Sequence, residues 1–135
     1  MILCPHMGES KRFVVIEDRP EWQAEIRQAL QESGHVVVDR AQTLRDALAL
    51  VPTLKKLKID AVTLDGNLCD ELVDGRRLGD DGQDILRAIR KIAPKIKIIG
   101  MSLNSMPNVD INIYKPGDTK RALDTAISTL FSKKK

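Results

Sequence analysis

The sequence predicts an α/β protein with a doubly wound parallel sheet that carries helices on both faces. Short apolar runs alternate with helical patterns along the whole chain, which is typical of successive strand–helix–strand units. The 135 residues suffice for one compact domain with a hydrophobic core, and no internal repeat or linker interrupts them. We expect an irregular lead-in over residues 1–10, the domain over residues 11–132 and a solvated basic tail over residues 133–135.

Five short apolar runs predict the strands of this sheet, at residues 13–16, 36–38, 59–64, 96–101 and 109–113. The first run is continuous and rich in β-branched residues, which is typical of a strand buried on both faces. In the last run apolar residues alternate with polar ones. That alternation indicates a strand with one wet face, at an edge of the sheet.

Four segments with apolar residues at helical spacing predict the helices. The first begins near Pro20 and contains Trp22, which we expect to be core or partly exposed. The second begins at Thr43 in the manner of a capping box, the third ends before Pro94, and the last begins after Asp118.

Composition and charge exclude several classes of protein. The net charge of +3 is small and the basic residues are dispersed, so nothing indicates nucleic acid as a partner. No apolar run approaches the roughly 20 residues that a membrane-spanning helix needs, and the first residues do not resemble a signal peptide. We expect Cys4 and Cys69 to be free thiols in a reducing cytosol, which indicates a cytoplasmic protein.

Polar and charged side chains follow four of the predicted strands. They are Glu17 and Asp18 after the first strand, Asp65 after the third, Ser102 after the fourth and Lys115 after the fifth. The carboxyl ends of parallel strands meet at one edge of the sheet, so we expect these side chains to lie together. Taken singly, each has an ordinary explanation, such as a helix N-terminus for Glu17 and Asp18.

The three carboxylates predict a cation site. Carboxylates crowded into one crevice repel one another unless a cation offsets their charge, and Mg²⁺ suits a site with few carboxylates, several waters and a phosphate. Lys115 supplies a positive charge for an anionic group, and Ser102 can donate a hydrogen bond to a phosphoryl oxygen. A carboxylate that attacks phosphorus forms an acyl phosphate, so the set predicts phosphoryl transfer to an aspartate.

The order of these motifs resembles the receiver domain of two-component response regulators over residues 12–132. The matching segments are Glu17-Asp18, residues 62–65, Asp81-Gly82, residues 99–102 and Lys115-Pro116. The resemblance implies a five-stranded sheet in the flavodoxin-like order 2-1-3-4-5. It also implies a cytoplasmic phosphoprotein in a phosphorelay.

The resemblance implies a role for each site residue. Asp65 would accept a phosphoryl group from a phosphohistidine on a sensor histidine kinase or a histidine phosphotransfer protein. Lys115 would contact the phosphoryl group, and Ser102 would be the switch hydroxyl. The implied Mg²⁺ ligands are Glu17, Asp18, Asp65 and the backbone carbonyl of Asn67.

Three features depart from the family pattern. The loop over residues 68–79 is longer than usual, and it is either a lid, a partner contact or a tolerated insertion. Only residues 103–109 separate the fourth and fifth strands, fewer than the about 10–12 residues of a helical crossover, so we expect the fourth helix to be reduced or absent. Asn112 stands where the family has an aromatic residue. We expect Tyr114 to be one pleat position away from the strand face on which that aromatic residue lies.

The sequence leaves more than one function open. The first is a single-domain response regulator that signals through contacts with an output protein and is no enzyme beyond its own phosphorylation and dephosphorylation. The alternative is a pseudo-receiver that binds a partner without phosphorylation; the complete set of acids opposes it and the missing helix favours it. A phosphatase of the haloacid dehalogenase type would need a second acid where this chain has Asn67. We expect His35 to have a structural role.

Overall fold

The computed structural model describes most of the predicted domain. The residues that it describes are 10–65, 81–102, 106–114 and 117–132, together with two short strands at 72–73 and 76–77. The predicted basic tail and residues 1–9 of the predicted lead-in lie outside this part of the chain.

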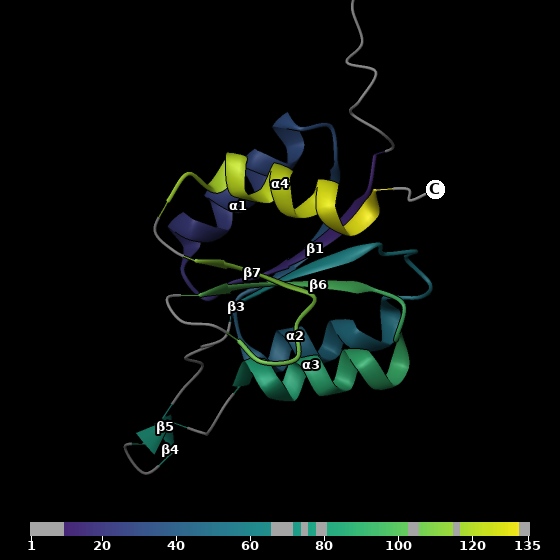
Figure 1. Cartoon of the computed structure of the whole chain (residues 1–135). Helices are drawn as coiled ribbons and strands as arrows, with labels where there is room; N and C mark the ends of the chain where they lie inside the picture. Colours follow the sequence, from purple (N-terminus) through teal and green to yellow (C-terminus); the bar gives the residue numbers. More distant parts are fainter. Residues whose placement is uncertain are drawn as a thin grey trace, which may run out of the picture.

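A five-stranded parallel sheet forms the centre of the molecule (Figure 1). Its strands lie side by side in the order β2-β1-β3-β6-β7, and each neighbouring pair is parallel. Their bounds are β1 (Arg12–Ile16), β2 (Val36–Ala41), β3 (Ala61–Asp65), β6 (Lys97–Ser102) and β7 (Ile111–Tyr114). Counted along the chain within this sheet, the order is 2-1-3-4-5, which confirms the prediction.

Helices cover both faces of the sheet (Figure 1). One face carries α1 (Pro20–Glu32) and α4 (Thr119–Phe131). The other face carries α2 (Leu44–Leu50), which runs on into the 3-10 turn η2 (Val51–Thr53), and α3 (Asp81–Ile92). Among the described residues, none of these helices is long and apolar enough to cross a membrane.

Side chains that cap the helices match the signals in the sequence. The Thr43 hydroxyl accepts a hydrogen bond from the backbone N–H of Asp46 at 3.0 Å, as in a capping box. Asp118 accepts one from the N–H of Arg121 at 3.1 Å. The first helix begins at Pro20, whose missing N–H costs nothing at that position.

The sheet has a separate apolar core on each face. Alternate residues of β1, β3 and β6 contribute to the two cores, as the pleat of a strand requires. On the α2–α3 side the residues from these three strands are Val14, Ile16, Val62, Leu64 and Ile98. On the α1–α4 side the residues from the same strands are Phe13, Val15, Ala61, Ile99 and Met101. The continuous apolar runs therefore mark the central strands, which are buried on both faces.

The two edge strands differ in detail from their predictions. Strand β2 extends to Ala41, and Val36 at its start is 45% exposed. Strand β7 lies at the other edge, as predicted, but it begins at Ile111 and leaves Val109 in the preceding connection. The expectation for Tyr114 is wrong, because residues two apart on a strand point to the same face, and Tyr114 therefore shares the face of Asn112.

The connection from β6 to β7 contains no helix in its described part, residues 106–110. A reduced or absent fourth helix is thus confirmed for these residues. The longer loop after β3 contains a small antiparallel hairpin, in which β4 (Leu72–Val73) pairs with β5 (Arg76–Arg77). The hairpin lies away from the main sheet in Figure 1. Whether it acts as a lid, as a partner contact or as a passive insertion stays a prediction.

Candidate functional site

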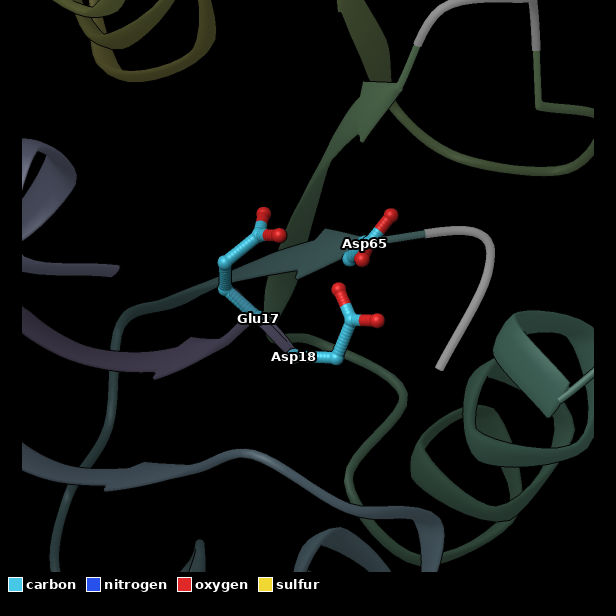
Figure 2. Close-up of side chains that lie close together, drawn as sticks. All are labelled: Glu17, Asp18 and Asp65. Carbon is cyan, nitrogen blue, oxygen red and sulfur yellow. The ribbon is translucent and has the colours of Figure 1, made fainter. Parts of the chain in front are cut away.

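Three acidic side chains gather at the carboxyl ends of two neighbouring central strands (Figure 2). Glu17 and Asp18 follow β1, and Asp65 is the last residue of β3. One carboxylate oxygen from each residue lies within 4.8 Å of those from the other two. Glu17 is 1% exposed and Asp65 is 5% exposed, while Asp18 is partly exposed. The sequence therefore predicted correctly that these three residues lie together.

The cluster lies where the order of the strands reverses. From β1 the chain first adds β2 on one side, and then adds β3, β6 and β7 on the other. Ligands of open α/β sheets bind outside the carboxyl ends of the strands at such a switch point. The position of the cluster is therefore set by topology, because Ile16 of β1 pairs with Leu64 of β3 directly before the acids.

The connection from β1 to α1 holds two of the acids in a short, hydrogen-bonded stretch. The N–H of Glu17 donates to the carbonyl of Ala41 at 3.0 Å, and the N–H of Arg19 donates to the Glu17 carboxylate at 3.4 Å. Pro20 then begins α1. Only residues 17–19 separate β1 from α1, so the backbone that carries the two acids is short and held at both ends.

A buried polar residue beside the acids that the sequence analysis missed is Gln23, on the first turn of α1. Its side chain is 3% exposed, and its amide nitrogen donates to the carbonyl of Glu17 at 3.2 Å and to that of Ala41 at 3.1 Å. Its neighbour Trp22 is partly exposed, within the range predicted. The signal was present in the spacing, since Gln23 precedes the buried Ile26 by three positions on the same helical stripe.

The structure describes the other predicted site residues only in part. Ser102 ends β6, and its neighbour Met101 pairs with Asp65, so the backbone of Ser102 reaches the same edge of the sheet as the acids. The side chain of Ser102 lies outside the described part. Asn67 and Lys115 lie outside it altogether. Tyr114, the last described residue of β7, pairs with Ser102 at the same edge of the sheet as the acids.

The acid cluster fits a hard divalent cation. Its three ligand atoms are carboxylate oxygens, which Mg²⁺ prefers, and three ligands leave room for water and for a phosphate oxygen. Crowded carboxylates in a partly buried setting interact strongly, because the local dielectric is lower than that of water. It is the one such cluster within the residues that the structure describes. Chemically, such an arrangement can hold a divalent cation beside a buried carboxylate.

His35 lies at the opposite end of the sheet from this cluster, directly before β2. Its Nδ1 accepts a hydrogen bond from the backbone N–H of Lys11 at 3.0 Å, and its ring packs against Phe13 with centroids 5.4 Å apart. Burial lowers the pKa of His35 below its usual value, with a smaller opposing effect from Asp124. These contacts support the structural role predicted for His35.

Comparisons with known proteins agree with this geometry. A receiver domain protein from Methanospirillum hungatei JF-1 is 19% identical with a TM-score of 0.71, over 90% of this chain and 94% of that one. The CheX–CheY–BeF3–Mg²⁺ complex from Borrelia burgdorferi gives 18% identity and a TM-score of 0.71, with 90% of each chain covered. The response regulator PhyR from Brucella abortus is 25% identical with a TM-score of 0.71, over 93% of this chain and 51% of that one.

No match was found among curated proteins. The sequence profile of the response regulator receiver domain matches residues 13–121, which is most of the chain and includes the three acids and Gln23. The predicted resemblance is thereby confirmed. The chain belongs to the response regulator receiver domain family.

Proposed function

We propose that this receiver domain accepts a phosphoryl group on Asp65 in a Mg²⁺-dependent reaction. The observation that carries the proposal is the convergence of three carboxylates within 4.8 Å at the switch point of the sheet. Asp65 ends the central strand β3 and is 5% exposed, so its carboxylate is held by a rigid element. Membership of the receiver family supports the same role.

The reaction requires one bond to form and one to break. A carboxylate oxygen of Asp65 would attack the phosphorus of a phosphohistidine, and the P–N bond to the donor would break. The electron pair of that bond stays on the imidazole nitrogen, which then takes up a proton. The product is an acyl phosphate on Asp65 and a neutral histidine on the donor.

Glu17, Asp18 and Asp65 would hold Mg²⁺, together with the backbone carbonyl of Asn67. When bound, the cation would offset the negative charge that collects on the transferring group. Lys115 would place its ammonium group against the phosphoryl oxygens, and Ser102 would donate a hydrogen bond to one of them. Apart from the three acids, these assignments rest on the family resemblance.

We propose a sensor histidine kinase or a histidine phosphotransfer protein as the donor, and a separate protein as the output partner. The Borrelia structure, which contains a CheX protein with CheY, BeF3 and Mg²⁺, supports a protein partner and the cation for a relative of the same fold. We further propose that the domain occupies residues 11–132, with residues 1–10 as a lead-in and residues 133–135 as a basic tail.

A labelling experiment tests the proposal. The protein is incubated with Mg²⁺ and a small acyl-phosphate donor, and the phosphoprotein is then tested for stability in acid and in base. We expect an acid-stable, base-labile label that disappears in Asp65→Asn. The matched control is Asp46→Asn, the same chemical change at an exposed position on α2, which should keep the label. A label that survives Asp65→Asn would contradict the proposal.

A second candidate is the pseudo-receiver, a module that binds its partner without phosphorylation. The altered connection between β6 and β7 favours it, because residues 106–110 form no helix and Asn112 occupies the position of the family's aromatic residue. The two candidates give different results in the labelling experiment. A pseudo-receiver shows no label with any donor, yet it binds its partner equally well with and without the donor.

A further inference from the structure

The side-chain amide of Gln23 is buried between two strand ends. Its nitrogen lies between two backbone carbonyls that belong to different strand ends, Glu17 after β1 and Ala41 at the end of β2. The side chain is 3% exposed, so its amide forms almost no hydrogen bonds with water. A polar group so buried requires partners, and these two carbonyls supply them.

The chemistry of the amide matches this position closely. A side-chain amide nitrogen carries two hydrogens, and each can be donated to one of the two carbonyls. Both partners are acceptors only, so the nitrogen and not the oxygen of the amide must face them. The carbonyl of Ala41 also accepts a hydrogen bond from the N–H of Glu17 at 3.0 Å. This one carbonyl therefore accepts two hydrogen bonds at the ends of β1 and β2.

Gln23 is also tied into the start of α1. Its backbone N–H donates to the carbonyl of Arg19 at 2.9 Å, which closes the first turn of the helix. The residue therefore joins three elements at the same place: the end of β1, the end of β2 and the beginning of α1. Glu17 and Asp18 lie on the short backbone stretch between these attachment points.

We propose that Gln23 is a positioning residue for the cation site. By holding the carbonyl of Glu17, its amide fixes the peptide from which the Glu17 and Asp18 side chains extend toward Asp65. Gln23 does not itself contact the cation, and it acts through the backbone of two ligands. This inference rests on the proposed Mg²⁺ site and adds a residue that the acids alone do not specify.

The test variant is Gln23→Met, which keeps nearly the same length and removes both donors. Outer partners of metal ligands typically change affinity by 10–100-fold, so we expect Mg²⁺ to bind about tenfold more weakly. Titration calorimetry with Mg²⁺ alone measures this, and the fluorescence of Trp22, the one tryptophan in the chain, gives a second readout. The matched control is Gln28→Met on the same helix, whose exposed amide donates to the Glu32 carboxylate and to none of the residues that surround the acids in the described structure.

Two further variants separate positioning from simple destabilisation. Val51→Ala removes core volume on the face away from α1, and it should lower stability while leaving Mg²⁺ affinity unchanged. Gln23→Asn keeps the donors on a shorter side chain, and its affinity should fall between wild type and Gln23→Met. It also serves as the test if Gln23→Met does not fold.

The outcomes distinguish this inference from the proposed function. If wild type binds Mg²⁺ and accepts the label while the Gln23 variants bind Mg²⁺ as tightly as wild type, the positioning role is wrong and the proposed function stands. If Val51→Ala weakens binding as much as Gln23→Met at equal stability, the positioning role is likewise wrong. If wild type itself binds no Mg²⁺, the proposed function fails and this inference fails with it.

Discussion

Two side-chain amides hold backbone in two different regions of this receiver domain. Gln23 bonds the ends of β1 and β2 beside the acid cluster. Asn112, on β7, bonds Met106 in the connection from β6: its oxygen accepts the Met106 N–H at 2.9 Å, and its nitrogen donates to the Met106 carbonyl at 3.2 Å. The first amide supports a region that matches the family, and the second supports a region that departs from it.

The connection around Met106 is held by further polar bonds to α3. Gln83 donates to the carbonyl of Pro107 at 3.0 Å, and Arg90 donates to the carbonyl of Asn108 at 3.0 Å and to the Asp110 carboxylate at 3.1 Å. A helix satisfies its backbone carbonyls with its own N–H groups. This short connection instead accepts hydrogen bonds from side chains of α3 and β7. Because the two regions share none of these hydrogen bonds, we expect a change in one region to leave the other unaffected.

The largest expected effect is at the acid cluster. Glu17→Gln removes a charged ligand and leaves a neutral amide of the same shape, so Mg²⁺ binding should weaken by at least about 100-fold. Titration calorimetry measures the change. Stability should not fall comparably, because the variant also relieves repulsion among the three carboxylates. Unchanged Mg²⁺ affinity in this variant would remove Glu17 from the site.

A smaller effect is expected at Gly100, which allows the connection to approach the sheet. A Cβ there would lie 3.0 Å from Asn112 Oδ1 and 3.0 Å from the Met106 sulfur. Gly100→Ala should therefore cost about 1–3 kcal/mol in urea unfolding, as overpacking does. The control is Gly117→Ala, where the nearest atom is the Tyr114 carbonyl oxygen at 3.6 Å, an ordinary contact. Equal stability of the two variants would show that the close approach is not a constraint.

Asn112→Leu should destabilise the connection without affecting the cation site. The change leaves the N–H and carbonyl of Met106 without their partners, which should cost about 1–2 kcal/mol because the site is only half-buried. Urea unfolding measures the cost, and calorimetry should give the Mg²⁺ affinity of wild type. If Mg²⁺ affinity falls with Asn112→Leu, the two regions are coupled.

The smallest expected effect is the pH dependence of stability caused by His35, which lies in neither of the two regions. Because burial holds the pKa of His35 below its unfolded value, the unfolded chain binds more protons between the two values. The contribution of His35 to the free energy of unfolding is therefore complete above the ordinary histidine pKa of about 6.5. This contribution is lost as the pH falls below that value. Urea unfolding at a series of pH values measures this slope. His35→Asn, which keeps an acceptor for the Lys11 N–H, should flatten it, and a slope unchanged in that variant would assign the effect elsewhere.

Much of the fold was predictable because hydrophobic pattern and chain order are local properties. The run before Glu17 identified a strand buried on both faces, the run before Asp65 identified a further strand, and alternation near Ile111 identified an edge strand. The shortness of the segment after Ser102 ruled out a full helical crossover by counting alone. The prediction for Tyr114 was wrong because Tyr114 lies two residues after Asn112 and therefore on the same face of β7.

The order of strands and acids along the chain was enough to predict which acids converge, because parallel strands bring their carboxyl ends to one edge whatever the details of packing. How the backbone beside those acids is held could be learned from the folded structure alone. The role of Gln23 depends on two carbonyls that are 6 and 18 residues away from it in the chain. Hydrogen bonds between separate elements depend on distances in space, which spacing along the chain does not specify.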